Sequence, residues 1–207
     1  MNLSTLSPTQ LDTLKEVSNV GMGHAASALS QMLSTPIDVR VPRIALVEIG
    51  DIPEVVGGAE AEVAGIRLAM NGPVQGTLLL VFPGDSARRL LGRLLAGRGG
   101  ESLDELAVSA LKEVGNILAS AYLVALGGFL GLPLLPSVPQ LAWDMAGAVL
   151  DEILCELGAA GEQALLIETE FHGEVPLSEV VRGHFLILPD PATLQVILSG
   201  AAGVRKA

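Results

Sequence analysis

Two short segments of the chain carry a carboxylate and an amide at the same spacing. Glu16 and Asn19 form one such pair, and Glu113 and Asn116 form the other. A side-chain amide has an acceptor and donors on one rigid plane, so it can hold a water molecule in a fixed orientation. A carboxylate three residues earlier can pair with a cation of a bound partner. The two pairs are therefore the first candidates for a chemical site.

Each pair belongs to a polar stripe on an expected helix. At about 100° per residue, Asp12, Glu16 and Asn19 fall within an arc of about 60°. Ser109 has the place of Asp12 before the second pair. A solvated helix face explains a single stripe, but Asn is a mediocre interior helix residue because its amide competes for backbone hydrogen bonds. Two copies of the stripe therefore favour a functional role.

The two stripes belong to halves of the chain that repeat. A shift of 97 residues places LDTLKEVSNV, which starts at Leu11, over VSALKEVGNI, which starts at Val108. The ends of the halves also correspond, since GTLLLVFPGD from Gly76 resembles GHFLILPDPA from Gly183. We interpret the chain as a tandem duplication within one domain, residues 1–207, with internal repeats over residues 7–98 and 101–203.

Capping residues predict where the two long helices begin. Ser7 is followed by Pro8 and by Gln10, which is a capping box with proline at the first helical position. Ser102 and Glu105 repeat the box before the second helix. The faces opposite the polar stripes should lie in the core. Their residues are Leu14, Val17, Gly21, Ala25, Ala28 and Met32 in the first helix and Leu111, Val114, Leu118 and Leu126 in the second.

Alternating apolar residues predict strands that follow one another as hairpins. A half-buried strand is expected over residues 37–49, and a hairpin over 60–70 and 76–83 turns at Asn71-Gly72-Pro73. The second half has a weak strand over 136–142 and a hairpin over 163–172 and 179–188. Shorter helices are expected after Asp85, over 144–157 and from Pro191. The pattern predicts an α+β fold of two αβββ-type repeats, with two long helices on an antiparallel sheet and pseudo-two-fold symmetry.

Residues 114–143 contain no charged side chain, which raises the question of a membrane helix. Gly127 and the glycines and prolines that follow it should end the helix near Leu126, and the remaining piece is shorter than the ~20 apolar residues of a span. We therefore expect a buried core helix and no membrane span.

Composition excludes several classes of protein. The chain has 12 Lys+Arg against 23 Asp+Glu, a net charge of -11, which disfavours binding to nucleic acid. Its one cysteine, Cys155, cannot form an intrachain disulfide, and the N-terminus lacks the basic and apolar regions of a secretory signal. A cytoplasmic location follows as the expectation.

Two further patterns are weaker. The G-x-G-x-x-A spacing from Gly21 to Ala26 follows no strand, so close helix packing explains it better than a dinucleotide site. The three histidines have neither mutual spacing nor nearby cysteines for a zinc site. No metal and no cofactor of its own are expected for this chain.

The doubled motif is specific. It consists of Asp or Ser, three residues, Glu, two residues, Asn, twenty-two residues and Pro, and both copies are without gaps. They are Asp12, Glu16, Asn19 and Pro42, and Ser109, Glu113, Asn116 and Pro139. In this pattern and over essentially its whole length the chain resembles the CheC/CheX/FliY phosphatase family of bacterial and archaeal chemotaxis, most closely the CheC branch. Ser18 departs from the family, which usually has glycine there, as the second copy does at Gly115.

The resemblance implies a phosphatase for the phospho-aspartate of a CheY-type response regulator. It implies that Asn19 and Asn116 position the attacking water and that Glu16 and Glu113 pair with the lysine of the receiver's active site. The magnesium ion would belong to the receiver. The supporting motif residues are Asp12 and Ser109, at the edge of the docking face, and Pro42 and Pro139, for which an edge-strand role fits equally well.

The resemblance also leaves a second function open. CheC-like proteins partner with CheD, a receptor deamidase, so the chain could be a non-catalytic adaptor that captures CheD or the phosphorylated regulator. Capture of CheD without any dephosphorylation would favour the adaptor.

Overall fold

The computed structural model describes residues 6–95, 103–157, 163–173 and 180–203. Its helices are α1 (Pro8–Leu33), a 3-10 turn η1 (Ile49–Asp51), α2 (Ile52–Val55), α3 (Gly84–Leu94), α4 (Glu105–Leu130), α5 (Ala146–Leu157) and α6 (Pro191–Gly203). Its strands are β1 (Ile37–Arg40), β2 (Ile44–Glu48), β3 (Glu62–Asn71), β4 (Gly76–Pro83), β5 (Leu135–Pro136), β6 (Gln140–Met145), β7 (Gln163–Gly173) and β8 (Val181–Pro189).

All eight strands form one antiparallel sheet in the order β1-β7-β8-β4-β3-β5. β2 continues the β1 edge along β7, and β6 continues the β5 edge along β3. The predicted hairpins, β3 with β4 and β7 with β8, are confirmed. At the centre of the sheet β4 pairs with β8, so the two halves of the chain share one sheet.

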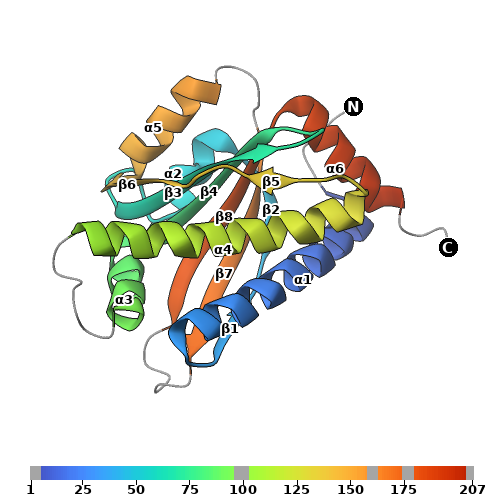
Figure 1. Ribbon diagram of the computed structural model, residues 1–207. Helices are drawn as coiled ribbons and strands as arrows, with labels where there is room; N and C mark the ends of the chain where they lie inside the picture. The colour runs from blue at the N-terminus through green and yellow to red at the C-terminus, as the bar shows by residue number, and fades with distance from the viewer. Residues whose placement is uncertain (1–5, 96–102, 158–162, 174–179, 204–207) are drawn as a thin grey trace.

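The sheet separates two apolar layers because alternate strand residues point to opposite faces. Leu78, Leu80 and Phe82 of β4 belong to the larger cluster, which includes buried residues of α1, α3, α4 and α6. Leu79 and Val81 belong to the smaller cluster with residues of η1, α2 and α5. Figure 1 shows α1 and α4 side by side over the same face of the sheet. The predicted α+β architecture with two long helices on an antiparallel sheet is confirmed, and the boundaries of the two repeats stay a prediction.

Helix α1 begins as its sequence predicts. The Ser7 Oγ accepts a hydrogen bond from the Gln10 backbone N–H at 3.2 Å, and the Ser7 N–H donates to the Gln10 Oε1 at 2.9 Å. The box predicted at Ser102 and Glu105 is wrong. The N-cap of α4 is Asp104, whose Oδ1 accepts from the Ala107 N–H at 2.8 Å, and Ser102 lies outside the described residues. The Asp104 carboxylate satisfies a free N–H of the first turn of α4, so it fixes the helix start two residues later than predicted.

The end of α4 also corrects the sequence prediction. The helix does not stop near Leu126 but runs through Gly127 to Leu130 and is capped by Gly131 at φ 68°. The chain then folds back, and the Leu132 N–H donates to the Gly127 carbonyl at 2.9 Å. A Cβ on Gly127 would lie 2.5 Å from the Leu132 carbonyl oxygen. Glycine therefore makes room for the return of the chain rather than breaking the helix.

With 26 residues, α4 is the one helix among the described residues that is long and apolar enough to cross a membrane. Its buried residues pack against α1 and the sheet, as in the core helix of a folded domain. Its length and composition are therefore weak evidence for a span, and the absence of one stays our expectation.

Two smaller sequence predictions also change, and a third is confirmed. Asp85 lies inside the first turn of α3, whose N-cap position is Pro83, so it does not cap that helix. Met32 of α1, expected in the core, is exposed. Asp190 behaves as expected, since its Oδ1 accepts from the Thr193 N–H at 2.6 Å at the start of α6.

Candidate functional site

A cleft of about 780 Å³ lies between α4 and the segment that joins β5 to β6. Ser109, Glu113 and Asn116 line it from α4, and Pro139 lines it from the joining segment. Pro139 is 23 residues beyond Asn116 in the chain, so only the folded structure brings them together. The complete second copy of the motif therefore meets in one cavity.

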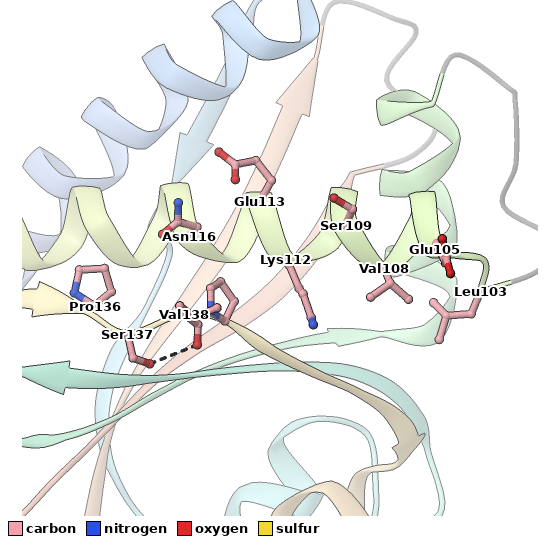
Figure 2. Close-up of a pocket in the computed structure, with 11 residues that line it drawn as sticks. Leu103, Glu105, Val108, Ser109, Lys112, Glu113, Asn116, Pro136, Ser137 and Val138 are labelled. Carbon is pink, nitrogen blue, oxygen red and sulfur yellow. Dashed lines mark hydrogen bonds between the residues drawn. The ribbon is translucent and has the colours of Figure 1, made fainter.

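The polar side chains of this cleft are available to a partner. Ser109 and Glu113 are exposed and Asn116 is half-buried, while Val114 and Gly115 between them are buried. Figure 2 shows Glu113 and Asn116 leaving the same side of α4. Within the described part of the chain, neither the Glu113 carboxylate nor the Asn116 amide has a side-chain hydrogen bond or ion pair. The predicted solvent-facing stripe is confirmed on α4 for Ser109 and Glu113, while Asn116 is half-buried in the cleft.

The first copy of the motif lies on α1. Asp12, Glu16 and Asn19 are all exposed, as predicted, and Leu14 and Val17 face the core. Pro42 is exposed and follows β1, which packs on α1. The first copy is therefore placed on corresponding elements, a long helix and an edge strand, but its Asn is more exposed than Asn116.

Both motif prolines interrupt an edge strand. Pro42 lies between β1 and β2, which both pair with β7, so the single strand predicted over residues 37–49 is two strands. Pro139 lies between β5 and β6, which both pair with β3. Proline lacks the N–H that a strand donates to its neighbour, so it is tolerated at such a break. In the second copy the break also forms a wall of the cleft.

The surroundings of the two copies differ in one respect that sequence reasoning missed. Val138, directly before Pro139, is 83% exposed in the cleft wall, whereas Val41, directly before Pro42, is 6% exposed. Leu103 adds a further exposed apolar side chain to the cleft. No sequence signal distinguishes the two valines, because both precede a motif proline.

The first copy has ion pairs around its proline, whereas the second copy has the exposed apolar side chains of Val138 and Leu103. Arg40 pairs with Asp38 at 2.7 Å, and Arg43 pairs with Glu168 at 3.0 Å. Both arginines flank the Val41-Pro42 break. The two copies therefore present different surfaces around the same polar residues.

Comparison with known proteins identifies the family. The sequence pattern of the CheC-like family matches residues 10–46, which contain the whole first copy of the motif. The chain is 38% identical over 187 residues to the CheY-P phosphatase CheC of Bacillus subtilis (strain 168), and the alignment covers 87% of this chain and 88% of that protein. The chain belongs to the CheC-like family. The resemblance expected from the doubled motif is thus confirmed.

Other relatives of this CheC-like chain agree. The putative CheY-P phosphatase CheC1 of Halobacterium salinarum is 27% identical over 169 residues, which covers 79% of this chain and 83% of that protein. The crystal structure of Thermotoga maritima FliY matches with a TM-score of 0.76 at 20% identity, over 95% of this chain and 98% of that one. The FliM middle domain from H. pylori matches with a TM-score of 0.70 at 14% identity, over 94% and 99%. These two structures show that the CheC-like fold is shared.

Ser18, the departure from the CheC-like pattern, lies in the core. It is fully buried, and its Oγ donates to the Leu14 carbonyl at 2.7 Å. Its counterpart Gly115 lies against β3, where an added Cβ would come within 2.5 Å of the Ile66 Cγ2. Ser18 therefore faces away from Glu16 and Asn19, and its buried hydroxyl group is hydrogen-bonded within α1.

Outside the cleft, one polar cluster joins α3 to the sheet. Glu62 of β3 accepts from the Trp143 Nε1 at 2.8 Å and from the Arg88 Nη2 at 2.5 Å, and these bonds hold the pKa of Glu62 below its usual value. The Arg88 guanidinium also lies 5.4 Å from the centre of the Trp143 ring. The cluster fixes α3 against β3 and β6, so its charges are already paired.

The described residues contain no group of three His, Cys, Asp or Glu side chains that could hold a metal ion. That this chain works without a metal or cofactor of its own stays a prediction.

Proposed function

We propose that this chain hydrolyses the aspartyl-phosphate of a CheY-type response regulator. One observation carries the proposal: Ser109, Glu113, Asn116 and Pro139 meet in one cleft and leave an amide and a carboxylate unpaired there among the described residues. The proposal is supported by the 38% identity to a protein named as a CheY-P phosphatase.

The reaction needs little covalent chemistry from the enzyme. A water oxygen bonds to phosphorus while the bond between phosphorus and the aspartyl oxygen breaks. The electron pair of that bond stays on the regulator's carboxylate, and the water proton passes to the phosphate or to solvent. Because the transition state for phosphoryl transfer is loose, positioning of the water and neutralisation of charge are the main requirements. No general base is needed.

Asn116 is suited to position the water. Its amide can accept one hydrogen bond from the water and donate another to a phosphoryl oxygen, which places the nucleophile behind phosphorus. The residue is half-buried in the cleft wall, so the surrounding helix and strand segment limit its freedom. A positioned water in a restricted site gains the advantage of proximity.

Glu113 lies one turn before Asn116 and serves docking. Its exposed carboxylate pairs with the lysine of the receiver's active site and so sets the depth at which α4 enters. Ser109, one turn earlier again, contacts the receiver at the edge of this face. The magnesium ion is the receiver's own. On α1, Glu16 and Asn19 have the same roles, with Asp12 and Pro42 as their supporting residues.

The decisive experiment is the decay of the phosphorylated regulator with this protein present. Wild type, Asn19→Ala, Asn116→Ala and the double variant are compared, with circular dichroism to show that each variant is folded. We expect wild type to accelerate the decay and the double variant to lose the acceleration, because neither site can then position the water. The variants should stay folded, because the two side chains face solvent or the cleft. A fully active double variant would contradict the water-positioning role.

The same experiment separates the alternative function. If wild type does not accelerate decay, hydrolysis is excluded as the activity of this chain. Stable capture of CheD, or of the phosphorylated regulator, by that inactive protein would then favour the adaptor.

A further inference from the structure

Lysine is rare in this chain, and its positions are not scattered. There are three lysines, Lys15, Lys112 and Lys206, against nine arginines. Lys15 directly precedes Glu16 and Lys112 directly precedes Glu113, while Lys206 lies outside the described residues. The family motif has no fixed position there. Two of three lysines therefore stand beside the proposed docking glutamates without a reason from that motif.

The cleft gives Lys112 a defined place. Its side chain is half-buried and lines the cleft together with Glu113 and Asn116. Being four residues before Asn116, it is rotated from Asn116 by only about 40° around the helix. Figure 2 shows Lys112 leaving α4 on the side of Val138 and Glu113 leaving it on the other side. Around the helix Asn116 lies between the two charged residues, about 40° from Lys112 and about 60° from Glu113.

Lys112, like the exposed Lys15 on α1, has no ion-pair partner among the described residues. Among the described residues that line the cleft it is the one cationic side chain, and it makes no hydrogen bond or ion pair with any described residue. Arg40, Arg43, Arg88 and Arg182 each pair with a carboxylate. A chain with a net charge of -11 thus keeps a cation beside Asn116 that no described carboxylate neutralises.

We propose that Lys112 is a further catalytic residue of the second site, whose ammonium group contacts the phosphoryl oxygens of the bound regulator. This inference rests on the function proposed above. In the loose transition state, negative charge is spread over three equatorial oxygens, and a lysine serves as a point charge for such a group. Partial burial strengthens this interaction because less water screens it. Lys112 keeps its proton throughout, so the balance of the reaction is unchanged.

A structural role for Lys112 makes a different prediction. Its half-buried side chain lines the cleft together with Val138, and a lysine stem can serve as apolar packing while its charge stays in solvent. Methionine preserves most of that stem without the charge, and arginine preserves the charge with a different shape. The two substitutions therefore separate packing from electrostatics.

The test uses Asn19→Ala as the parent, so that turnover reports the second site. Lys112→Met and Lys112→Arg are made in it, with Lys15→Met in the silenced first site as the matched control. The kcat and KM for phosphorylated regulator are measured for each. We expect Lys112→Met to lower kcat about tenfold, as for loss of one charge-assisted contact. Lys112→Arg should recover most of the rate, and Lys15→Met should equal the parent.

Each other result overturns the assignment. An unchanged kcat for Lys112→Met, or a change confined to KM, would show that Lys112 does not act on the phosphoryl group. An equal loss for Lys112→Arg, or for Lys15→Met, would show a structural effect. If the parent is inactive while wild type is active, the second site is idle and the Lys112 assignment fails alone. Inactivity of wild type would instead remove the proposed function and Lys112 with it.

Discussion

Gly21 of α1 meets Tyr122 of α4 where the two long helices touch. A Cβ built on Gly21 would lie 3.0 Å from the Tyr122 Cα and 3.3 Å from the Ala125 Cβ. Gly21 is two residues beyond Asn19 and Tyr122 is six beyond Asn116, so this contact sets one motif helix against the other. The interpretation of the G-x-G-x-x-A spacing as close helix packing is confirmed at Gly21. It is wrong for Gly23, which is exposed and where an added Cβ would have no neighbouring atom within 4 Å.

The helix contact predicts opposite effects for the same substitution at these two glycines. Gly21→Ala should lower the free energy of unfolding by about 1–2 kcal/mol, because the added methyl meets backbone that must move. Gly23→Ala should raise it by about 0.5–1 kcal/mol, because alanine is the better helix former where nothing opposes it. Urea denaturation measures both. A neutral or stabilising Gly21→Ala would contradict the close contact.

The core side of the motif helices predicts a second asymmetric pair. Gly115→Ser should cost about 1–3 kcal/mol of unfolding free energy. The new Cβ would meet the Cγ2 of buried Ile66, and the β-branched isoleucine side chain has little freedom to move aside. Ser18→Gly should cost only about 0.5 kcal/mol, which is the difference in helix propensity. Measured in an Asn116→Ala background, Ser18→Gly should leave turnover at the first site unchanged. A large change in that rate would show that Ser18 influences Asn19.

Val138 predicts a functional effect without a cost in stability. Its side chain is already 83% exposed, so Val138→Asp should leave the free energy of unfolding within about 0.5 kcal/mol of wild type. In an Asn19→Ala background it should raise the KM for phosphorylated regulator about five- to tenfold, because an apolar contact is replaced by a charge. Val124→Asp is the control, since Val124 is exposed on α4 but does not line the cleft. Equal KM values for both variants would exclude Val138 from the interface.

Local chemistry explains what the sequence could predict. The start of α1 depends on Ser7 and Gln10, which are three residues apart, and the hairpins depend on alternation within each strand. The motif stripe is fixed by helix periodicity, so its exposure on α1 and α4 followed from spacing alone. Where tertiary packing matters, prediction failed. Gly127 was interpreted as a helix breaker, but it lies inside α4, whose buried residues pack against α1 and the sheet, and the Leu132 N–H closes the helix end on the Gly127 carbonyl.

The candidate site shows the same limit. Its residue types were predictable because they recur in both halves, but the cleft exists only once α4 and the β5–β6 segment pack together. Val41 and Val138 occupy equivalent places in the repeated sequence, yet one is buried and the other exposed. Tertiary packing alone decides between them. Lys112 had a sequence signal, the rarity of lysine, whose meaning depends on the cleft that it lines.

His184 of β8 predicts how stability depends on pH. Burial lowers its pKa from 6.5, and the charge of Glu168 on the neighbouring strand opposes that shift in part. Its Nδ1 is buried without a hydrogen-bond partner among the described residues, and Glu168 itself is paired with Arg43. Because the unfolded chain binds the proton more readily, this contribution to stability is complete above about pH 6.5 and is lost as the pH falls through the folded-state pKa.

Urea denaturation between pH 7.5 and 5.5 should therefore show a declining free energy of unfolding for wild type and a flatter profile for His184→Gln. This range stays above the usual carboxylate pKa values, so Glu62 contributes little to the slope. Parallel profiles for the two proteins would assign the pH dependence to other groups.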